Sequence, residues 1–266
     1  MNGGLSIKIF FNVLKTDLHR AVFSVSFILG IVATISIMFF GSVGMVNNFT
    51  PAVIAFEHSY CYNNIINLLL LVDTFAYSAS FATEWQNGFF QSIIIRSNPT
   101  VYSLSKCVST AIASGLSIVI GVVLFIIYIC ISLPTIMPDA YTINTEVAAL
   151  KDLLFIGNPI LYFLGYLYVI FLQAAFFGVL ALLVSGYFPN KYVAYATSFT
   201  LGTAINQLDN KLGVPNWMDP IKLALVRVYG ISPSKVFFIE TVTFMVLTAI
   251  CSVLFVRIVK RRIENG

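Results

Sequence analysis

The amino-acid sequence predicts an all-α integral membrane protein with six transmembrane helices, an N-terminal interfacial amphipathic helix and an extracellular helical hairpin before the last span. Of the 266 residues, 59% are hydrophobic and only 10% are charged, and the mean hydropathy is +0.91, whereas soluble domains are roughly a quarter charged. Several apolar runs reach the ~20 residues that a helix needs to cross a bilayer. We therefore expect residues 1–266 to form a single transmembrane domain. A disordered chain is excluded, and the dispersed net charge of +4 excludes a nucleic-acid-binding protein.

The first element, residues 5–20, has the pattern of an amphipathic helix. Its polar residues are spaced by four, three and four, which places them on one face, whereas the apolar residues lie mostly on the other. The polar residues are Lys8, Asn12, Lys15 and His19, and the apolar ones are Ile7, Phe10, Phe11, Leu14 and Leu18. We expect this helix to lie in the inner membrane interface. A plain cytoplasmic extension of the first span is the alternative.

Four apolar runs predict transmembrane helices at 21–46, 65–82, 108–133 and 159–184. The first and third carry no charge, and the second contains one carboxylate, Asp73. The fourth begins at Asn158, which suits a helix cap, and Pro159, which suits the first helical position. In lipid each run must satisfy its own backbone hydrogen bonds, which favours helices.

The last two spans are predicted at 192–207 and 236–256. The run 192–207 is short and rich in small residues, which suit close packing inside a helix bundle. Residues 208–235 between the two spans are predicted to form the outer hairpin, since Lys222 and Arg227 are too costly for the bilayer centre. Glu240, near the start of the last span, is expected to reach the outer headgroups.

The distribution of Lys and Arg supports six spans with both termini in the cytoplasm, because cytoplasmic flanks attract positive charge. Ten of the 15 basic residues then lie inside: Lys8, Lys15, Arg20, Arg96, Lys106, Lys191, Arg257, Lys260, Arg261 and Arg262. Omitting the span at 192–207 would place the C-terminal basic cluster outside. We expect a multi-pass protein of the plasma membrane of a bacterium.

Residues 83–97 join the second and third spans and are predicted to form a cytoplasmic coupling helix. Its apolar residues can enter a groove of a partner protein while its charges set the orientation; a helix resting on the lipid surface is the alternative. The order of residues resembles the coupling segment of type-2 ABC (ATP-binding cassette) transporter permeases. The matching positions are Glu84, Trp85, Asn87-Gly88, Arg96, the turn at Asn98-Pro99, and Lys106.

The resemblance implies a half-transporter that exports a peptide, a lipid-like molecule or a drug. It implies that a cytoplasmic ATP-binding cassette subunit docks on the coupling residues, namely Glu84, Trp85, Asn87, Gly88, Phe89 and Arg96. It also implies a second permease subunit, either another copy of this chain or a related one. The chain has no G-x-x-x-x-G-K-[ST] motif to hold nucleotide phosphates. We therefore expect no ATPase activity and no cofactor on this chain, with ATP and Mg bound by the partner.

Asp73 is the carboxylate expected deepest in an apolar run, and an ionisable group there indicates a functional site. One hypothesis places Asp73 and the nearby Tyr77 on a translocation path; the alternative is a structural hydrogen bond from Asp73 to a neighbouring hydroxyl. If Asp73 carries transport by itself, the chain is an ATP-independent secondary carrier or channel. The four cysteines lack metal-site spacing, so no metal is expected. Pairing of Cys61 with Cys130 remains open.

Overall fold

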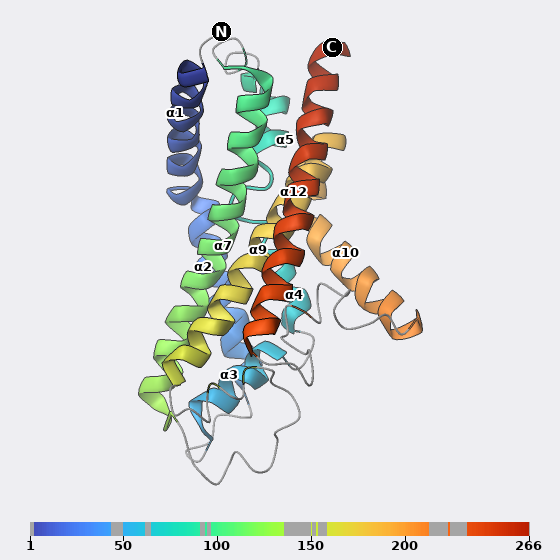
Figure 1. Cartoon of the computed structure of the whole chain (residues 1–266). Coiled ribbons are helices and arrows are strands. Elements are labelled where there is room, and N and C mark those ends of the chain that lie inside the picture. The colour runs from blue at the N-terminus through green and yellow to red at the C-terminus, as the bar shows by residue number, and fades with distance from the viewer. Residues whose placement is uncertain are drawn as a thin grey trace.

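The computed structural model is a bundle of helices (Figure 1), and no strand occurs among the residues that it describes. These residues are 3–43, 50–61, 65–90, 94, 97–135, 150, 153, 159–212, 223 and 233–265. Both termini and α5 (Ser80–Gln86) lie at one end of the bundle, and α3 (Ala52–Cys61) lies toward the other. We call the first of these the terminal end.

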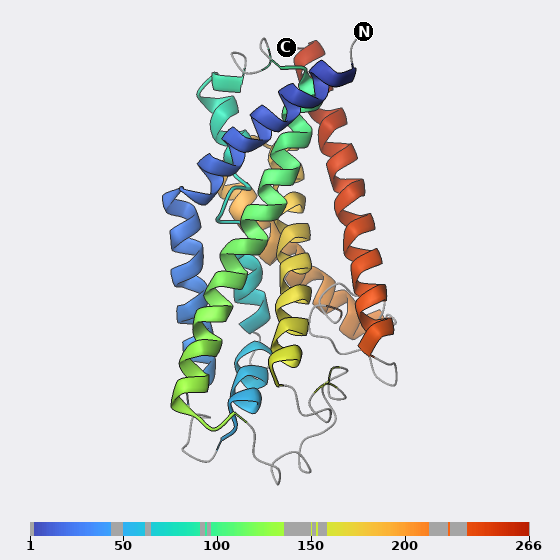
Figure 2. The ribbon, with the colours of Figure 1, turned by 60° about the vertical axis from the view of Figure 1, so that its left-hand side comes forward.

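The predicted N-terminal helix is confirmed as α1 (Gly3–Val22), and its four polar residues are exposed as expected. It lies obliquely across α7 (Pro99–Ser132) at the terminal end (Figure 2). The first span starts later than predicted, with α2 covering Val25–Ser42. The chain breaks at Phe23 and Ser24 because Ser24 caps α2, its hydroxyl oxygen accepting from the Phe27 N–H at 3.1 Å.

The prediction of one continuous helix over 65–82 is wrong. Helix α4 (Ile65–Val72) ends before Asp73, residues 73–79 form turns, and α5 then begins at Ser80. The hydroxyl of Thr74 donates to the backbone oxygens of Leu71 (2.8 Å) and Tyr195 (3.1 Å). Short polar side chains compete in this way with helical hydrogen bonds, and the run contains several that the hydropathy pattern does not weigh.

Helices α7 and α9 (Pro159–Tyr187) form the centre of the bundle. Helix α9 starts at Pro159 as predicted and ends three residues beyond the predicted span. Helix α7 starts nine residues earlier than predicted, because the Asn98 side chain accepts from the Thr100 N–H and Pro99 begins the helix. Small residues bring the two helices together: a Cβ at Gly178 would collide with the Ser114 hydroxyl.

The remaining predicted span positions are occupied by α10 (Lys191–Leu212) and α12 (Pro233–Asn265). Helix α12 packs against α9 and α7 and continues through the basic residues at the C-terminus. Helix α10 diverges from the bundle (Figure 1). The predicted hairpin at 208–235 lies largely outside the described residues; Leu223 within it is buried.

Four of the described helices are long and apolar enough to cross a membrane: α2, α7, α9 and α12. The chain runs from the terminal end along α2 and comes back through α3, α4 and α5 before α7 begins (Figures 1 and 2). Likewise α10 leads away from the terminal end before α12 returns to it. The molecule is therefore an all-helical protein whose composition and helix lengths are those of a membrane protein.

Candidate functional site

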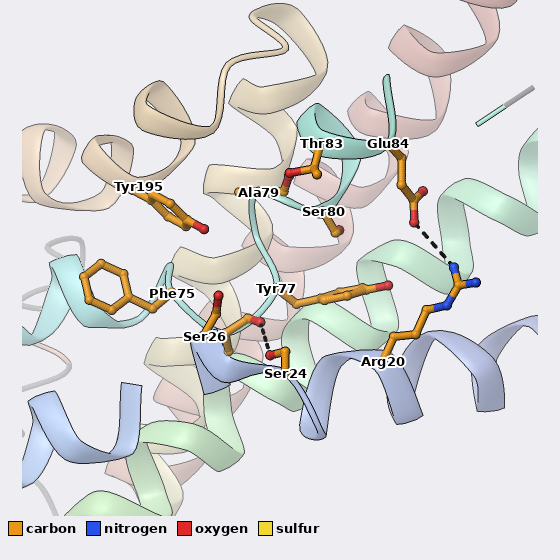
Figure 3. A pocket seen from close by; sticks show the side chains of 11 residues that line it. Arg20, Ser24, Ser26, Phe75, Tyr77, Ala79, Ser80, Thr83, Glu84 and Tyr195 are labelled. Atoms are coloured by element: carbon orange, nitrogen blue, oxygen red, sulfur yellow. Dashed lines mark hydrogen bonds and ion pairs between the residues drawn. The ribbon is translucent and has the colours of Figure 1, made fainter. Parts of the chain in front are cut away.

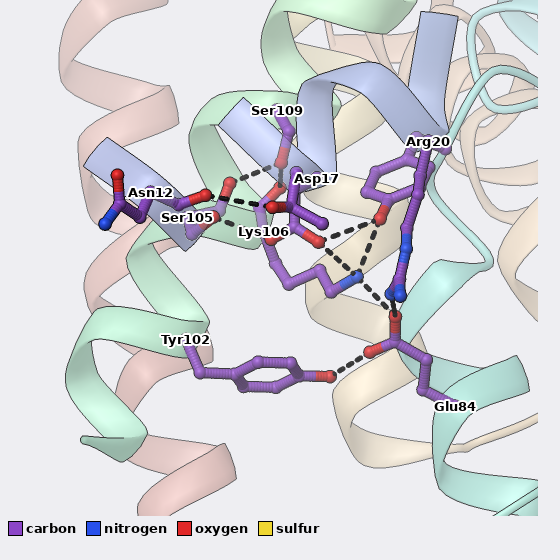
Figure 4. Close-up of polar contacts among 10 residues, drawn as sticks. Asn12, Asp17, Arg20, Glu84, Tyr102, Ser105, Lys106 and Ser109 are labelled. Atoms are coloured by element: carbon purple, nitrogen blue, oxygen red, sulfur yellow. Dashed lines mark hydrogen bonds and ion pairs between the residues drawn. The ribbon is translucent and has the colours of Figure 1, made fainter. Parts of the chain in front are cut away.

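A buried cluster of charges joins α1, α5 and α7 near the terminal end (Figure 4). At its centre is Lys106 of α7, whose side chain is fully buried. Its Nζ lies 3.1 Å from Oδ1 of Asp17 on α1 and 2.6 Å from Oε1 of Glu84 on α5. We call these three residues the ion triad. One ammonium group thus bridges two carboxylates that lie far apart in the sequence.

Hydroxyl groups satisfy the rest of the ion triad. Lys106 Nζ donates to the Tyr77 hydroxyl at 2.7 Å, and that hydroxyl donates to Asp17 Oδ1 at 3.1 Å. Ser105 donates to Asp17 Oδ2 and Tyr102 donates to Glu84 Oε2, both at 2.6 Å. All four carboxylate oxygens therefore accept a hydrogen bond, as buried charges require.

Arg20 lies at the solvent side of the ion triad. Its Nη1 is 3.9 Å from Glu84 Oε1, and 45% of its side chain is exposed. With Arg20 included, two cations face two carboxylates, so the formal charges cancel. Such a group is favourable only while it stays complete, because removing one member leaves a buried charge unpaired.

Helix α5 is also attached to the other side of the bundle. Trp85 stacks on Phe90 with ring centroids 4.3 Å apart, and the Arg262 guanidinium of α12 lies 5.2 Å from the Trp85 ring. The Gln86 amide donates to the backbone oxygen of Pro189, between α9 and α10, at 2.8 Å. Three consecutive side chains of α5 therefore contact three different parts of the bundle.

The turn after α5 is exposed. Asn87, Gly88 and Phe89 all face solvent, and 52% of Phe89 is accessible. Gly88 has a φ of 67°, which a residue without a Cβ adopts without strain. Of the predicted coupling residues, Glu84 and Trp85 thus point into the bundle, whereas Asn87, Gly88 and Phe89 form what we call the exposed tip. Arg96 and much of 91–97 lie outside the described residues.

Asp73 and Tyr77 occupy different surroundings. Tyr77 belongs to the charge cluster, whereas Asp73 lies in the turn between α4 and α5, near Gly178 of α9. Asp73 is 2% exposed, and its Oδ2 has no hydrogen-bond partner among the described residues. Within this part of the chain, Oδ2 of Asp73 therefore makes no hydrogen bond to a neighbouring hydroxyl.

Two acidic residues depart from the sequence analysis: Glu240 lies in a different environment from the one expected, and Asp17 was not singled out. Glu240 does not reach the headgroups: it is fully buried, and neither carboxylate oxygen has a hydrogen-bond partner among the described residues. It shares with Val236 and Phe244 the face of α12 that packs inward. Asp17 was missed, although its spacing from Leu14 and Ala21 places it on the apolar side of α1. An acid on the buried side of an amphipathic helix indicates a buried cation as its partner.

Among the described residues no group of His, Cys, Asp and Glu is arranged to hold a metal ion. Cys130 is a free thiol there, as are Cys107 and Cys251. Comparison of the chain with protein-family models, with curated proteins and with solved structures gives no match.

Proposed function

We propose that this chain is the membrane-spanning permease subunit of an ATP-driven ABC exporter, which couples ATP hydrolysis by a separate ATP-binding subunit to efflux of a peptide, lipid-like or drug-like substrate. The observation that carries the proposal is the position of α5. Its exposed tip faces solvent at the terminal end, while Glu84, Trp85 and Gln86 tie it to α7, to α12 and to the α9–α10 connection. A partner that moved the tip would therefore move several long helices together.

The proposal divides the coupling residues into two groups. Asn87, Gly88 and Phe89 dock on the ATP-binding subunit, which holds ATP and Mg. Glu84 and Trp85 transmit the movement inward, and Arg96 is assigned to the docking group by resemblance alone. The terminal end faces the cytoplasm of a plasma membrane, as the basic residues favour. Segments 65–82 and 192–207 complete six spans, the outer hairpin at 208–235 precedes the last span, and a second copy or a related permease pairs with this chain.

The test is co-purification of ATP hydrolysis with the tagged full chain from its native cells in mild detergent. The variant is Phe89→Asp, which places a charge on the exposed tip and leaves Asp17, Glu84 and Lys106 unchanged, but also replaces the ring that the Arg20 guanidinium faces at 5.8 Å. A charge at the centre of an apolar contact costs on the order of 2 kcal/mol, so we expect ATPase activity in the eluate to fall about tenfold or more. Glu84→Arg is unsuitable because Glu84 is bonded to Lys106 and Tyr102 inside the bundle.

The matched control is Phe11→Asp, the same change at a phenylalanine of α1 that is 60% exposed. It should retain wild-type ATPase activity. Equal activity in the wild type and Phe89→Asp would reject the tip as the docking site. Absence of any ATP-hydrolysing partner from a well-folded wild-type sample would reject the exporter.

The second candidate function is an ATP-independent secondary carrier or channel that uses Asp73. It is favoured by the burial of Asp73 and by its oxygen without a partner among the described residues. Intramembrane carboxylates of this kind mark ion and proton pathways. It predicts transport that needs no ATP and is lost in Asp73→Asn, an outcome that the exporter does not require.

A further inference from the structure

A cavity of about 240 Å³ opens beside the charge cluster, where α1 meets α2 (Figure 3). Its walls come from the end of α1, the start of α2, the turn after α4, α5 and α10. It lies at the depth where the candidate span α2 begins. The cavity thus sits at the boundary between the apolar part of the bundle and the terminal end.

The two sides of the cavity differ in chemistry. On one side is Arg20, whose guanidinium carries five N–H donors and lies 3.9 Å from Glu84 Oε1, beyond hydrogen-bond distance. On the other side the side chains of Ser26 and Tyr195 point toward the cavity (Figure 3). Their hydroxyls make no hydrogen bond within the described part of the chain.

Together, the arginine and the hydroxyls suit a ligand in which an anionic group is attached to a neutral group that carries hydroxyls. Arginine with free donors matches a phosphate, and hydroxyls that both donate and accept match an alcohol. A cationic headgroup has no counter-charge here, because Glu84 already accepts from Lys106 and Tyr102. The cavity is also large enough to admit a phosphate with its alcohol.

The surroundings of the cavity mouth favour a lipid as the source of the phosphate. Phe23 and Val25 flank Ser24, a residue of the cavity wall, and are 75% and 73% exposed. Exposed apolar side chains next to the cavity suit acyl chains, and basic residues at the cytoplasmic interface attract anionic lipids. We propose that this cavity binds the phosphoglycerol headgroup of an anionic phospholipid, with the phosphate on Arg20 and the glycerol hydroxyls on Ser26 and Tyr195. The proposal goes beyond the exporter function and does not depend on it.

Thermal stability of the purified full chain in detergent, titrated with lipid, tests the site. The probes are dioleoyl phosphatidylglycerol, dioleoyl phosphatidylcholine, oleate and glycerol 3-phosphate. We expect saturable stabilisation of the wild type by phosphatidylglycerol and little by phosphatidylcholine or oleate. Saturation by glycerol 3-phosphate at a similar concentration would confirm the headgroup chemistry but identify a free phosphate ester, rather than a lipid, as the ligand.

Two variants locate the binding. Arg20→Gln should weaken binding of phosphatidylglycerol about tenfold, whereas Lys15→Gln, at an exposed cation on the same helix, should bind as the wild type does. Tyr195→Phe removes one hydroxyl that has no partner among the described residues, so the fold should be unaffected while binding weakens a few-fold. Wild-type binding by both Arg20→Gln and Tyr195→Phe would overturn the proposal, as would equal stabilisation by oleate and phosphatidylglycerol.

Discussion

At the scale of single residues, Lys106 has the largest predicted effect on stability. It is fully buried and lies between Asp17 and Glu84. Lys106→Met should lower the free energy of unfolding by about 3–5 kcal/mol, because the buried Asp17 would lose its cation and Glu84 would keep only the half-exposed Arg20, 3.9 Å away. Urea unfolding in detergent micelles measures this change.

The control for Lys106 neutralises the whole ion triad. A variant that combines Lys106→Met with Asp17→Asn and Glu84→Gln should recover most of the loss, since no buried charge remains unpaired. Equal stability of the Lys106→Met protein and the wild type would show that water or a rearrangement already screens the two carboxylates.

The residue scale also shows what the sequence could predict about the site. Glu84 and Lys106 stand out because Glu84 follows one apolar run and Lys106 precedes the next, and both belong to the charge cluster. Their pairing with Asp17 depends on how α1 crosses α7, and this angle has no signature in a single sequence. The inward direction of the Glu84 side chain likewise depends on Tyr102 and Lys106 lying one helical turn apart on α7.

At the scale of elements, the contact between α2 and α7 rests on glycine. The position of a Cβ at Gly121 lies 2.6 Å from Thr34 Cβ and 3.1 Å from the backbone oxygen of Ile31. Gly121→Ala should therefore push the helices apart and lower the unfolding free energy by about 1–3 kcal/mol. Urea unfolding measures this change, and Ile120→Ala, at a partly exposed neighbour on the same helix, is the control for altering α7 itself. A loss no larger than that of the control would contradict the close approach.

Element boundaries followed local chemistry more closely than hydropathy. The starts of α7 and α9 could be predicted from proline at the first helical position, although only the second was. The break at 73–79 could not, because it depends on Thr74 reaching the backbone of Tyr195 on a distant helix. Average hydropathy over 65–82 is insensitive to that contact.

At the scale of the whole molecule, the path of the chain predicts which residues share a side of the membrane. Lys15, Lys191 and Lys260 are exposed, on α1 and at the ends of α10 and α12, and we expect all three in the cytoplasm. Lys211, exposed at the far end of α10, should lie outside. Single cysteines at these positions, in a chain with its four native cysteines replaced, should react with an impermeant maleimide from the corresponding side only.

Labelling of positions 191 and 211 from the same side would show that α10 does not cross the membrane. Labelling of positions 15 and 260 from opposite sides would require an odd number of crossings and would reject the six-span topology. The four apolar helices are evident from the sequence because hydrophobic length alone predicts them. Whether segments 65–82 and 192–207 cross the membrane must be decided by this labelling, because the first segment is broken and the second is rich in small polar residues.

The burial of Lys106 also has a consequence for biosynthesis. Asp17 and Glu84 precede Lys106 by 89 and 22 residues, so a ribosome completes both acids before it adds the lysine. When the nascent α7 enters the bilayer, its ammonium group finds both counter-charges already made. Because of this order, α7 need not insert while the counter-charges of its buried lysine are still to be synthesised.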